Sequence, residues 1–403
     1  MTAPLRRIVV VGNGIAGLTA CDSLRSGGFD GELTVVGAET HHPYSRPALS
    51  KALLHGDDDL NAHQLPEPTH EASVLLGVGA AGLDVEARVV KLDDGGEVPY
   101  DGLVIASGSR ARRLAPEAGR SPDGAGAQDV TLRTIEDAIL LKQRVESRPS
   151  VVVVVGGGPL GMEVASGCLH AGCEVTLVTD GQPLARQLGG YLSEVFTSAA
   201  ARRGLRFVQG GTARLAGSGA DARVALADGT VLEADLIVAA VGDEPNTGWL
   251  AGSGILAGDG SLRVDSRGRV RPDIVAAGDV AHFPTRRGMG RVPLWTSAID
   301  QAKSAAAGLL EGDSAPEFDF EPYFWTEAFG LSLKAVGFTP MVGVPDYLEE
   351  GAAAESKLLR WQHGDGSGTA AAINYRIAIP KLRRLAGSGP EALARPSLTA
   401  LQH

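Results

Sequence analysis

Residues 8–17, with the sequence IVVVGNGIAG, decide the fold of this chain. The β-branched first half is typical of a strand that is buried on both faces. Gly12, Gly14 and Gly17 follow this strand at once and open a stretch with helical character. We interpret them as a tight turn, a point where a pyrophosphate approaches the main chain, and a close helix–strand contact. The pattern predicts a helix whose N-terminus holds the phosphates of a dinucleotide.

A second copy of this pattern begins at Val151. Five valines, residues 151–155, lead directly into Gly156, Gly158 and Gly161. One such motif is weak on its own, because glycines after a strand can form an ordinary turn. Two copies, each between a β-branched strand and a helix, predict two nucleotides on one protein, between which electrons can pass.

An acidic residue strengthens the first copy. A second apolar strand, residues 32–36, follows the first helix and leads to Glu39, 22 residues after Gly17. A ribose-binding acid is expected about 20 residues past the glycines. Strand, glycines, helix and acid therefore agree on a dinucleotide site.

Composition bounds the class of protein. The chain has 403 residues, 44% of them apolar, 54 glycines and a net charge of −11. This length suits two or three domains, and the glycines suit an α/β protein with many tight turns. An acidic chain without a basic stripe argues against nucleic acid. The apolar runs are shorter than a membrane span, and the run after Arg6-Arg7 is too short for a signal peptide, so we expect a cytoplasmic protein.

The number and spacing of the cysteines argue against thiol–disulfide exchange. Cys21, Cys168 and Cys173 are the three cysteines, and no two have C-x-x-C spacing. We expect Cys168 and Cys173, on and after the helix that follows the second glycine motif, to be small buried residues, and we see no suitable redox-active pair.

The order of these signals resembles the pyridine-nucleotide:FAD oxidoreductases. Within them, the chain is most similar to the ferredoxin and rubredoxin reductases that serve cytochromes P450 and aromatic dioxygenases. The most specific match is residues 46–51, RPALSK, which is similar to the R-P-P-L-S-K of that family. Further matches are residues 100–110 (YDGLVIASGSR), 242–246 (GDEPN), 277–280 (AGDV) and 324–325 (FW).

The resemblance implies an α/β fold with two Rossmann-like domains of the glutathione-reductase type and a smaller α+β C-terminal domain. Residues 1–112 and 246–322 would form a discontinuous FAD-binding domain, residues 113–245 an NAD(P)H-binding domain, and residues 323–403 the C-terminal domain. The Gly-, Pro- and Ala-rich residues 113–130 would be a linker. Elsewhere we expect helices over 134–146 and 298–310, a hairpin over 223–233 and a strand over 331–336.

The resemblance also implies the FAD site. Gly12, Gly14, Gly17 and Glu39 would hold the ADP half, and Arg46 and Lys51 would lie along the pyrophosphate and the flavin. Asp279 would bond the ribityl chain, although it could also cap a helix. Ser107 and Gly108 would pack on the cofactor, and the set is completed by Ala16, Pro47, Ala106, Arg110, Gly278, Leu294, Trp295 and Trp325. A tryptophan can equally be a core residue.

The NAD(P)H site follows in the same way. Residues 156–161, including Pro159 and Leu160, would take the pyrophosphate, with Thr179 and Gly242 beside the nucleotide. Glu163 matches the family's glutamate near the flavin and nicotinamide, so Lys51 and Glu163 would be the catalytic pair. A cation near the flavin stabilises the charge that hydride transfer leaves in the ring, and an ion pair keeps two buried charges matched. The alternatives are a solvated lysine and a helix-surface glutamate.

Three departures from the family pattern leave questions open. Thr179 stands where relatives often carry an acid that favours NADH, so NADPH is not excluded, although Asp180 next to it favours NADH. Leu294 replaces a polar residue, and Glu327-Ala328 replaces the usual Asp-Gln. The changes at Leu294 and at Glu327-Ala328 leave the identity of the electron acceptor open more than the reaction with the nicotinamide nucleotide.

We expect an NAD(P)H-dependent flavoprotein reductase that passes single electrons to a ferredoxin-type iron–sulfur protein, as a monomer or homodimer. An acidic ferredoxin calls for a basic patch; the candidates are Arg110, Arg112 and Arg113, then Arg286, Arg287 and Arg291, then Arg383 and Arg384. One alternative is a flavoenzyme that acts directly on a small molecule. Another is an NAD(H)-responsive redox sensor resembling apoptosis-inducing factor.

Overall fold

The computed structural model describes residues 5–51, 63–116, 129–217 and 222–393. They divide into two compact units. The first holds residues 5–48, 63–110 and 243–320. The second holds residues 49–51, 111–116, 129–217, 222–242 and 321–393. Each unit therefore gathers segments that are far apart in the sequence.

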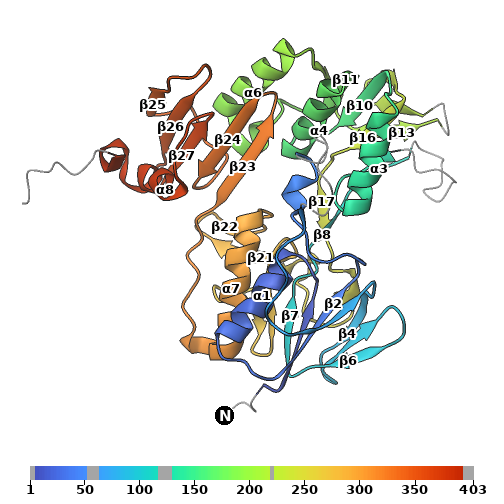
Figure 1. The fold of residues 1–403 in the computed structure, drawn as a ribbon, viewed down its shortest axis with the longest axis vertical. Helices are drawn as coiled ribbons and strands as arrows, with labels where there is room; N and C mark the ends of the chain where they lie inside the picture. The colour runs from blue at the N-terminus through green and yellow to red at the C-terminus, as the bar shows by residue number, and fades with distance from the viewer. Residues whose placement is uncertain (1–4, 52–62, 117–128, 218–221, 394–403) are drawn as a thin grey trace, which may run out of the picture. The chain divides into compact units, whose positions relative to one another are not determined.

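A six-stranded sheet in the order β19-β20-β7-β1-β2-β3 is the centre of the first unit (Figure 1). β1 pairs in parallel with β2 and β7, β2 with β3, and β7 with β20, whereas β19 is antiparallel to β20. Its strands are β1 (Arg7–Val11), β2 (Glu32–Gly37), β3 (Ser73–Leu76), β7 (Gly102–Ile105), β19 (Arg269–Arg271) and β20 (Ile274–Ala276). Because parallel strands end at the same edge, the turns after β1, β7 and β20 meet there.

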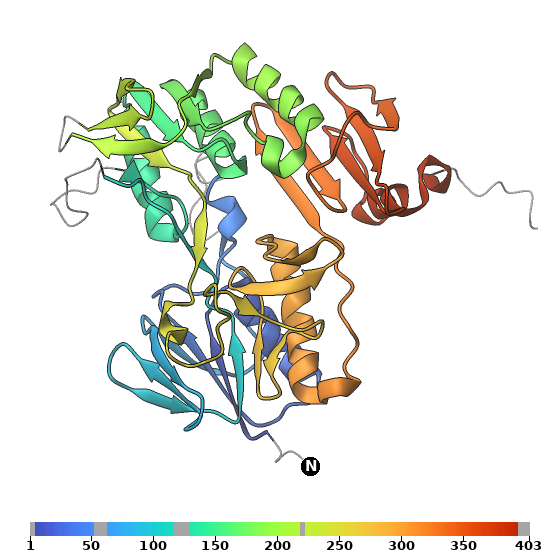
Figure 2. The same ribbon diagram turned by 180° about the vertical axis from the view of Figure 1, so that it is seen from behind.

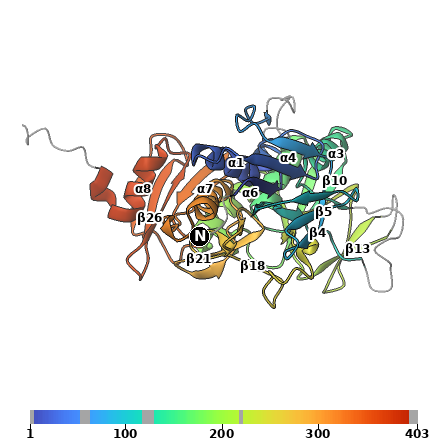
Figure 3. The ribbon, with the colours of Figure 1, turned by 90° about the horizontal axis from the view of Figure 1, so that it is seen from below.

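Both faces of this sheet are covered, as the β-branched sequence of β1 predicts. Ile8 and Val10 pack with α1 (Ile15–Ser26) and α7 (Trp295–Glu311), which lie side by side on one face (Figures 1 and 3). Val9 and Val11 belong to a second apolar cluster that includes Leu83 and Val90 of an antiparallel sheet. That sheet consists of β4 (Ala80–Asp84), β5 (Val89–Leu92) and β6 (Glu97–Pro99).

Short elements complete the first unit and its boundary. β8 (Ser109–Ala111) pairs with β17 (Asp243–Pro245), and β18 (Leu262–Arg263), β21 (Ala281–Thr285) and β22 (Gly288–Gly290) form a small sheet. The 3-10 turns are η1 (Arg46–Ala48), η4 (Gly248–Leu250) and η5 (Gly312–Ser314).

The second unit contains a five-stranded parallel sheet in the order β12-β11-β10-β16-β9. Its strands are β9 (Asp129–Val130), β10 (Val151–Val155), β11 (Glu174–Thr179), β12 (Arg206–Gln209) and β16 (Leu236–Ala239). The helices of this part are α3 (Ile135–Glu146), α4 (Pro159–His170), α5 (Ala185–Leu188) and α6 (Gly190–Arg202). Val153 and Val155 pack with Val224 and Leu226 of a three-stranded sheet (Figure 2). Its strands are β13 (Ala213–Ala216), β14 (Arg223–Leu226) and β15 (Val231–Glu233).

An antiparallel sheet, in the order β23-β24-β27-β26-β25, follows in the same unit. Its strands are β23 (Tyr323–Ala328), β24 (Leu331–Val336), β25 (Tyr347–Glu350), β26 (Lys357–Gln362) and β27 (Gly368–Ile373). α8 (Ile379–Ser388) packs Leu382 and Leu385 on this sheet, and η6 (Pro390–Leu393) follows it (Figure 3). Phe329 and Gly330, with φ of 54° and 71°, form the two-residue turn between β23 and β24. Positive φ at both positions suits the right-handed twist of a hairpin.

The predicted α/β class is confirmed, and so are the helix over 134–146, the hairpin and the strand over 331–336. Thr134 caps α3 in a capping box with Asp137. The helix expected from residue 298 begins at Trp295. The interpretation of Asp279 as a helix cap is wrong, because Asp279 lies in a turn between β20 and β21. Most of the expected linker, residues 117–128, lies outside the described residues, and at its ends Leu114 is buried and β9 joins the sheet.

Candidate functional site

The first glycine motif forms a tight strand–turn–helix joint. Gly12 has a φ of 118°, and a Cβ there would lie 2.1 Å from the Ala106 carbonyl oxygen, in the turn after β7. A Cβ on Gly17 would lie 1.9 Å from the Gly12 carbonyl oxygen. A Cβ on Gly14, in contrast, would meet nothing described within 4 Å. Gly12 and Gly17 are therefore required by packing, whereas Gly14 borders open space.

The N-terminus of α1 borders the same space. No described side chain caps the helix at Gly14, and the first amide of the helix with an intrahelical partner is that of Leu18, which donates to the Gly14 carbonyl at 2.9 Å. Free N–H groups and the positive end of the helix dipole suit an anion. Gly278 lies beside Ala16, since its Cβ would be 3.0 Å from that of Ala16. The residues here fit a pyrophosphate.

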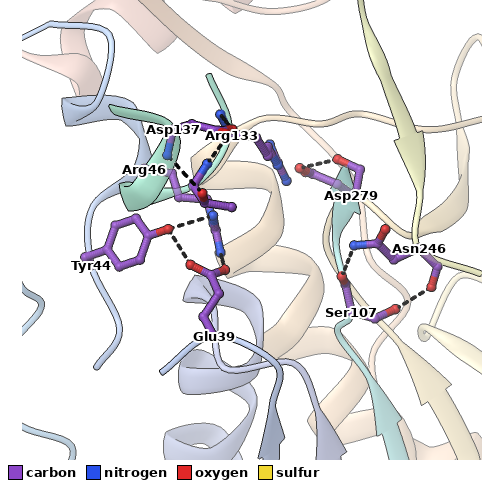
Figure 4. A network of polar contacts seen from close by, with 10 residues as sticks. Glu39, Tyr44, Arg46, Ser107, Arg133, Asp137, Asn246 and Asp279 are labelled. Atoms are coloured by element: carbon purple, nitrogen blue, oxygen red, sulfur yellow. Dashed lines mark hydrogen bonds and ion pairs between the residues drawn. The ribbon is translucent and has the colours of Figure 1, made fainter. Parts of the chain in front are cut away.

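Glu39, the expected ribose ligand, belongs to a local polar cluster (Figure 4). Its Oε2 accepts a hydrogen bond from the Tyr44 hydroxyl at 2.6 Å, and its Oε1 pairs with the Arg46 guanidinium. Arg46 also donates to the Tyr44 hydroxyl at 2.9 Å and lies over the Tyr44 ring. Burial lowers the pKa of Arg46, but electrostatic interactions with Tyr44, Glu39 and Asp279 and the bond to the Glu39 carboxylate outweigh it and leave that pKa above its ordinary value. The structure therefore pairs Arg46 with Glu39, the expected ribose ligand. The contact of Tyr44 with Glu39 was not predicted from the sequence.

Two further turns at the sheet edge are tied together. Ser107 Oγ donates to the Asn246 carbonyl at 2.9 Å, and Asn246 Nδ2 returns a bond to the Ser107 carbonyl at 2.9 Å (Figure 4). Asp279 accepts a long bond of 3.4 Å from Ser109, and its carbonyl accepts from Arg291 Nε at 2.6 Å. These contacts join the matched motifs 100–110, 242–246 and 277–280 in one place, although sequence reasoning did not select Asn246 as a site residue.

The second glycine motif repeats the geometry of the first. A Cβ on Gly156 would lie 2.1 Å from the Ala240 carbonyl oxygen, and one on Gly161 would lie 1.9 Å from the Gly156 carbonyl oxygen. Gly158 again borders open space, with Gln187 Nε2 at 3.8 Å as the nearest atom to its Cβ. Pro159 occupies the first turn of α4, where its missing N–H costs nothing. Pro159, Leu160 and the glycines therefore fit a second pyrophosphate.

Thr179 ends β11 beside this motif. A Cβ on Gly157 would be 2.6 Å from Thr179 Oγ1, and that hydroxyl donates to the Gly181 carbonyl at 2.9 Å. Asp180 accepts from Arg186 Nη2 at 2.7 Å, and both side chains are exposed. Arg186 is thus paired with the acid next to Thr179.

Lys51 and Glu163, which are 112 residues apart, are brought together. Lys51 Nζ lies 2.9 Å from Glu163 Oε1 and 3.0 Å from Oε2. Glu163 is only 4% exposed and the Lys51 side chain only 17%, so the interpretations of these residues as a solvated lysine and a helix-surface glutamate are wrong. Thr326 Oγ1 donates to Glu163 Oε1 at 2.5 Å, and the Ser50 hydroxyl donates to Oε2. Sequence reasoning missed Thr326 and Ser50, although both lie within or next to matched motifs.

The remaining predicted residues are dispersed. Arg110 is exposed and pairs with Glu244 at 2.6 Å. Leu294 precedes α7 and Trp295 is its first residue, in the first unit, whereas Trp325 lies on β23 of the second unit and stacks on Tyr323. Pro47 lies in η1, and Gly108 and Gly242, with φ of 67° and 99°, lie in turns. These positions by themselves assign no role.

Each predicted basic cluster contains arginines that pair with carboxylates. The pairs are Arg110–Glu244, Arg113–Asp129, Arg286–Asp319, Arg291–Asp243 and Arg383–Glu321. Pairing lowers the positive charge that each cluster can offer to an acidic partner.

The cysteines lie inside the protein as free thiols. Burial raises the pKa of Cys21 and of Cys168 to about 12 and raises that of Cys173. A buried thiol is a poor nucleophile, so the structure favours nucleotide chemistry over thiol–disulfide exchange.

Comparison with known proteins agrees with this geometry. The family model for pyridine nucleotide-disulphide oxidoreductases matches residues 6–302. The chain belongs to this family. It is therefore an oxidoreductase, and the family implies FAD and a nicotinamide nucleotide.

Individual proteins of this family can also be compared with the chain. The chain is 35% identical to the p-cumate 2,3-dioxygenase system ferredoxin--NAD(+) reductase component of Pseudomonas putida, over 84% of this chain and 82% of that protein. It is 34% identical to the anthranilate 1,2-dioxygenase system ferredoxin--NAD(+) reductase component of Burkholderia cepacia, over 97% of both. The reductase of a covalent putidaredoxin reductase–putidaredoxin complex superposes with a TM-score of 0.80 at 26% identity, covering 95% of this chain and 93% of that one. The resemblance predicted from the motifs is confirmed. Among the described residues, no helix is both long and apolar enough to cross a bilayer.

Proposed function

We propose that this protein is an FAD-dependent reductase that takes hydride from NADH and passes electrons singly to a ferredoxin-type iron–sulfur protein of an oxygenase or P450 system. The observation that carries the proposal is the pairing of Lys51 with Glu163, which lies on α4. The same helix begins at the second glycine motif, so a nucleotide bound at its N-terminus lies one turn from the pair. The named relatives act on ferredoxins, which supports the acceptor.

The first unit supplies the residues proposed for FAD. The amides at the start of α1 bind the pyrophosphate, with Gly14 leaving room for it. Glu39 would bind the ribose hydroxyls in place of its contacts with Tyr44 and Arg46, and Arg46 would pair with a phosphate. Asp279 takes the ribityl chain, and Ser107 and Asn246 keep the turns at the sheet edge in place. We propose residues 1–112 and 246–322 as the FAD domain, 113–245 as the NADH domain and 323–403 as the C-terminal domain.

FAD, when bound, accepts a hydride from the nicotinamide and releases electrons one at a time. The positive charge of Lys51 would stabilise the negative charge that hydride transfer leaves in the flavin ring, and Glu163 holds the Lys51 ammonium in place. We also propose Trp295 and Trp325, each in its own unit, as apolar contacts of the cofactor. Each of these side chains acts by position and charge, without a covalent step.

We propose NADH as the physiological donor. Asp180 places a carboxylate next to Thr179, at the strand end where the adenine ribose binds in this fold. Asp180 also pairs with Arg186, so the Arg186 guanidinium is already occupied and is less able to bind the 2′-phosphate of NADPH. The carboxylate itself would repel that phosphate.

Asp180→Asn is expected to raise kcat/KM for NADPH about 10-fold and to leave that for NADH within about twofold, because it removes one repulsive charge and releases Arg186. Steady-state kinetics with both nucleotides and an artificial acceptor measures the ratio. Asp180→Asn/Arg186→Ala is the control and is expected to lose most of the gain. An unchanged NADPH value in the single variant contradicts this assignment.

The proposal as a whole is tested with purified, FAD-loaded protein in a stopped-flow spectrometer. NADH is expected to bleach the flavin rapidly, and an oxidised [2Fe–2S] ferredoxin from the same organism is expected to restore its absorbance. Rapid bleaching followed by reoxidation with molecular oxygen or a small quinone, but with none of the source's ferredoxins, would refute the acceptor and leave the NADH half-reaction intact.

A further inference from the structure

We propose that Thr326 and Ser50 are positioning residues, whose hydroxyl groups hold the Glu163 carboxylate in the one orientation that fixes the Lys51 ammonium for hydride transfer. The inference rests on the proposed function, because it adds two residues to the Lys51–Glu163 pair. Neither hydroxyl needs to touch the nucleotide or the flavin to act in this way.

The contacts around Glu163 saturate its carboxylate. Oε1 accepts from Thr326 Oγ1 at 2.5 Å and lies 2.9 Å from Lys51 Nζ. Oε2 accepts from the Ser50 hydroxyl and lies 3.0 Å from Lys51 Nζ. Each oxygen therefore has one hydroxyl donor and shares the ammonium. A carboxylate has about four lone-pair sites, and these contacts leave little freedom for the group to rotate.

The site around Glu163 is buried, so the loss of either hydroxyl donor should have a large effect. Glu163 is 4% exposed and Thr326 is 1% exposed, so water cannot readily replace a lost donor. An unsatisfied buried charge is costly, and the ammonium alone would not fix the rotation of the carboxylate about its last bond. The two hydroxyls add no charge, so they orient the carboxylate while the ion pair stays neutral overall.

The hydroxyl of Thr326 is itself held firmly. Thr326 lies in β23, and three residues later the Phe329 amide donates to Ser166 Oγ at 2.9 Å. Glu163 and Ser166 are also three residues apart, so they share one face of α4. The hairpin of β23 and β24 thus meets α4 at two points. The branched Thr326 side chain has few rotamers, which further restricts its hydroxyl.

Three variants separate positioning from packing. Thr326→Val removes the hydroxyl and keeps the shape, whereas Thr326→Ser keeps the hydroxyl. Ser166→Ala is the matched control, because it removes the other hairpin–α4 contact without touching Glu163. The first readout uses the apoprotein: the rate of Lys51 acetylation by acetic anhydride, measured by mass spectrometry relative to exposed Lys91. The second is the rate constant of flavin reduction, separated from the Kd of NADH by varying its concentration.

In Thr326→Val, we expect Lys51 acetylation about 5-fold faster than in the wild type and flavin reduction about 10-fold slower, at unchanged NADH Kd, because a hydrogen bond to a charged group is lost. Thr326→Ser and Ser166→Ala should stay within about twofold in both readouts. Equal effects of Thr326→Val and Ser166→Ala would overturn the inference, since both would then report loosened packing. Unchanged values in Thr326→Val would overturn it as well.

Ser50→Ala provides the second route if Thr326→Val does not fold. It should raise Lys51 acetylation and slow flavin reduction in the same direction, and unchanged values overturn the role of Ser50. Glu163→Gln separates this inference from the proposed function. If the hydroxyl variants expose Lys51 but neither they nor Glu163→Gln slow flavin reduction, the donors orient the pair but the pair has no part in hydride transfer.

Discussion

Lys51→Met is expected to slow flavin reduction by NADH about 100-fold, which is the size of effect that follows loss of one group stabilising developing charge. Methionine keeps most of the length and apolar stem of lysine but removes the ammonium that lies 2.9 Å from Glu163. The FAD content should stay unchanged, because the residues proposed for the pyrophosphate and the ribose, at the start of α1 and at Glu39, are untouched. Stopped-flow absorbance of the flavin measures the rate.

The same variant is expected to destabilise the protein by about 3 kcal/mol, because it leaves a buried carboxylate without its cation. Urea unfolding of the apoprotein measures this loss in the free energy of unfolding separately from the rate of flavin reduction. Lys51→Met/Glu163→Gln removes both charges and should recover most of the stability but none of the rate. If stability and rate recover together, Lys51 serves folding and not hydride transfer.

Gly14→Ala and Gly17→Ala are expected to abolish FAD binding for different reasons. At Gly14 a Cβ has open space around it and φ is −90°, so the protein should fold normally while the new methyl group blocks the pyrophosphate. At Gly17 a Cβ would lie 1.9 Å from the Gly12 carbonyl oxygen. The helix or the strand must then shift, and we expect a loss of about 3 kcal/mol, which is typical of overpacking a core.

Far-UV circular dichroism, urea unfolding and flavin absorbance together separate the two cases. Gly14→Ala should have wild-type stability and no yellow colour. Gly158→Ala is its counterpart in the second motif, where a Cβ again has room; it should keep FAD and weaken NADH binding by about 10-fold or more. Loss of FAD in Gly158→Ala with NADH binding retained would reverse the assignment of the two nucleotides.

Local signals predicted much of the fold. The two strand–glycine–helix units were predictable because the valine runs and the glycine spacing act over about ten residues, and the structure repeats the same close approaches in both. The helix over 134–146 and the hairpin of β14 and β15 were predictable for the same reason. In the C-terminal sheet, β24 was predicted but β27 was not, because the sequence GTAAAI of β27 is recognised as a strand only by its partners on either side.

The sequence by itself determined that this protein has two dinucleotide motifs, an acid 22 residues past the first one, and the RPALSK segment that resembles a family. Only the tertiary structure decided that Thr326 and Ser50 share Glu163 with Lys51. The physical reason is distance along the chain. A glycine motif works within one turn, whereas the contacts of Glu163 join segments more than 100 residues apart, and only packing of α4 against the β23–β24 hairpin sets their geometry.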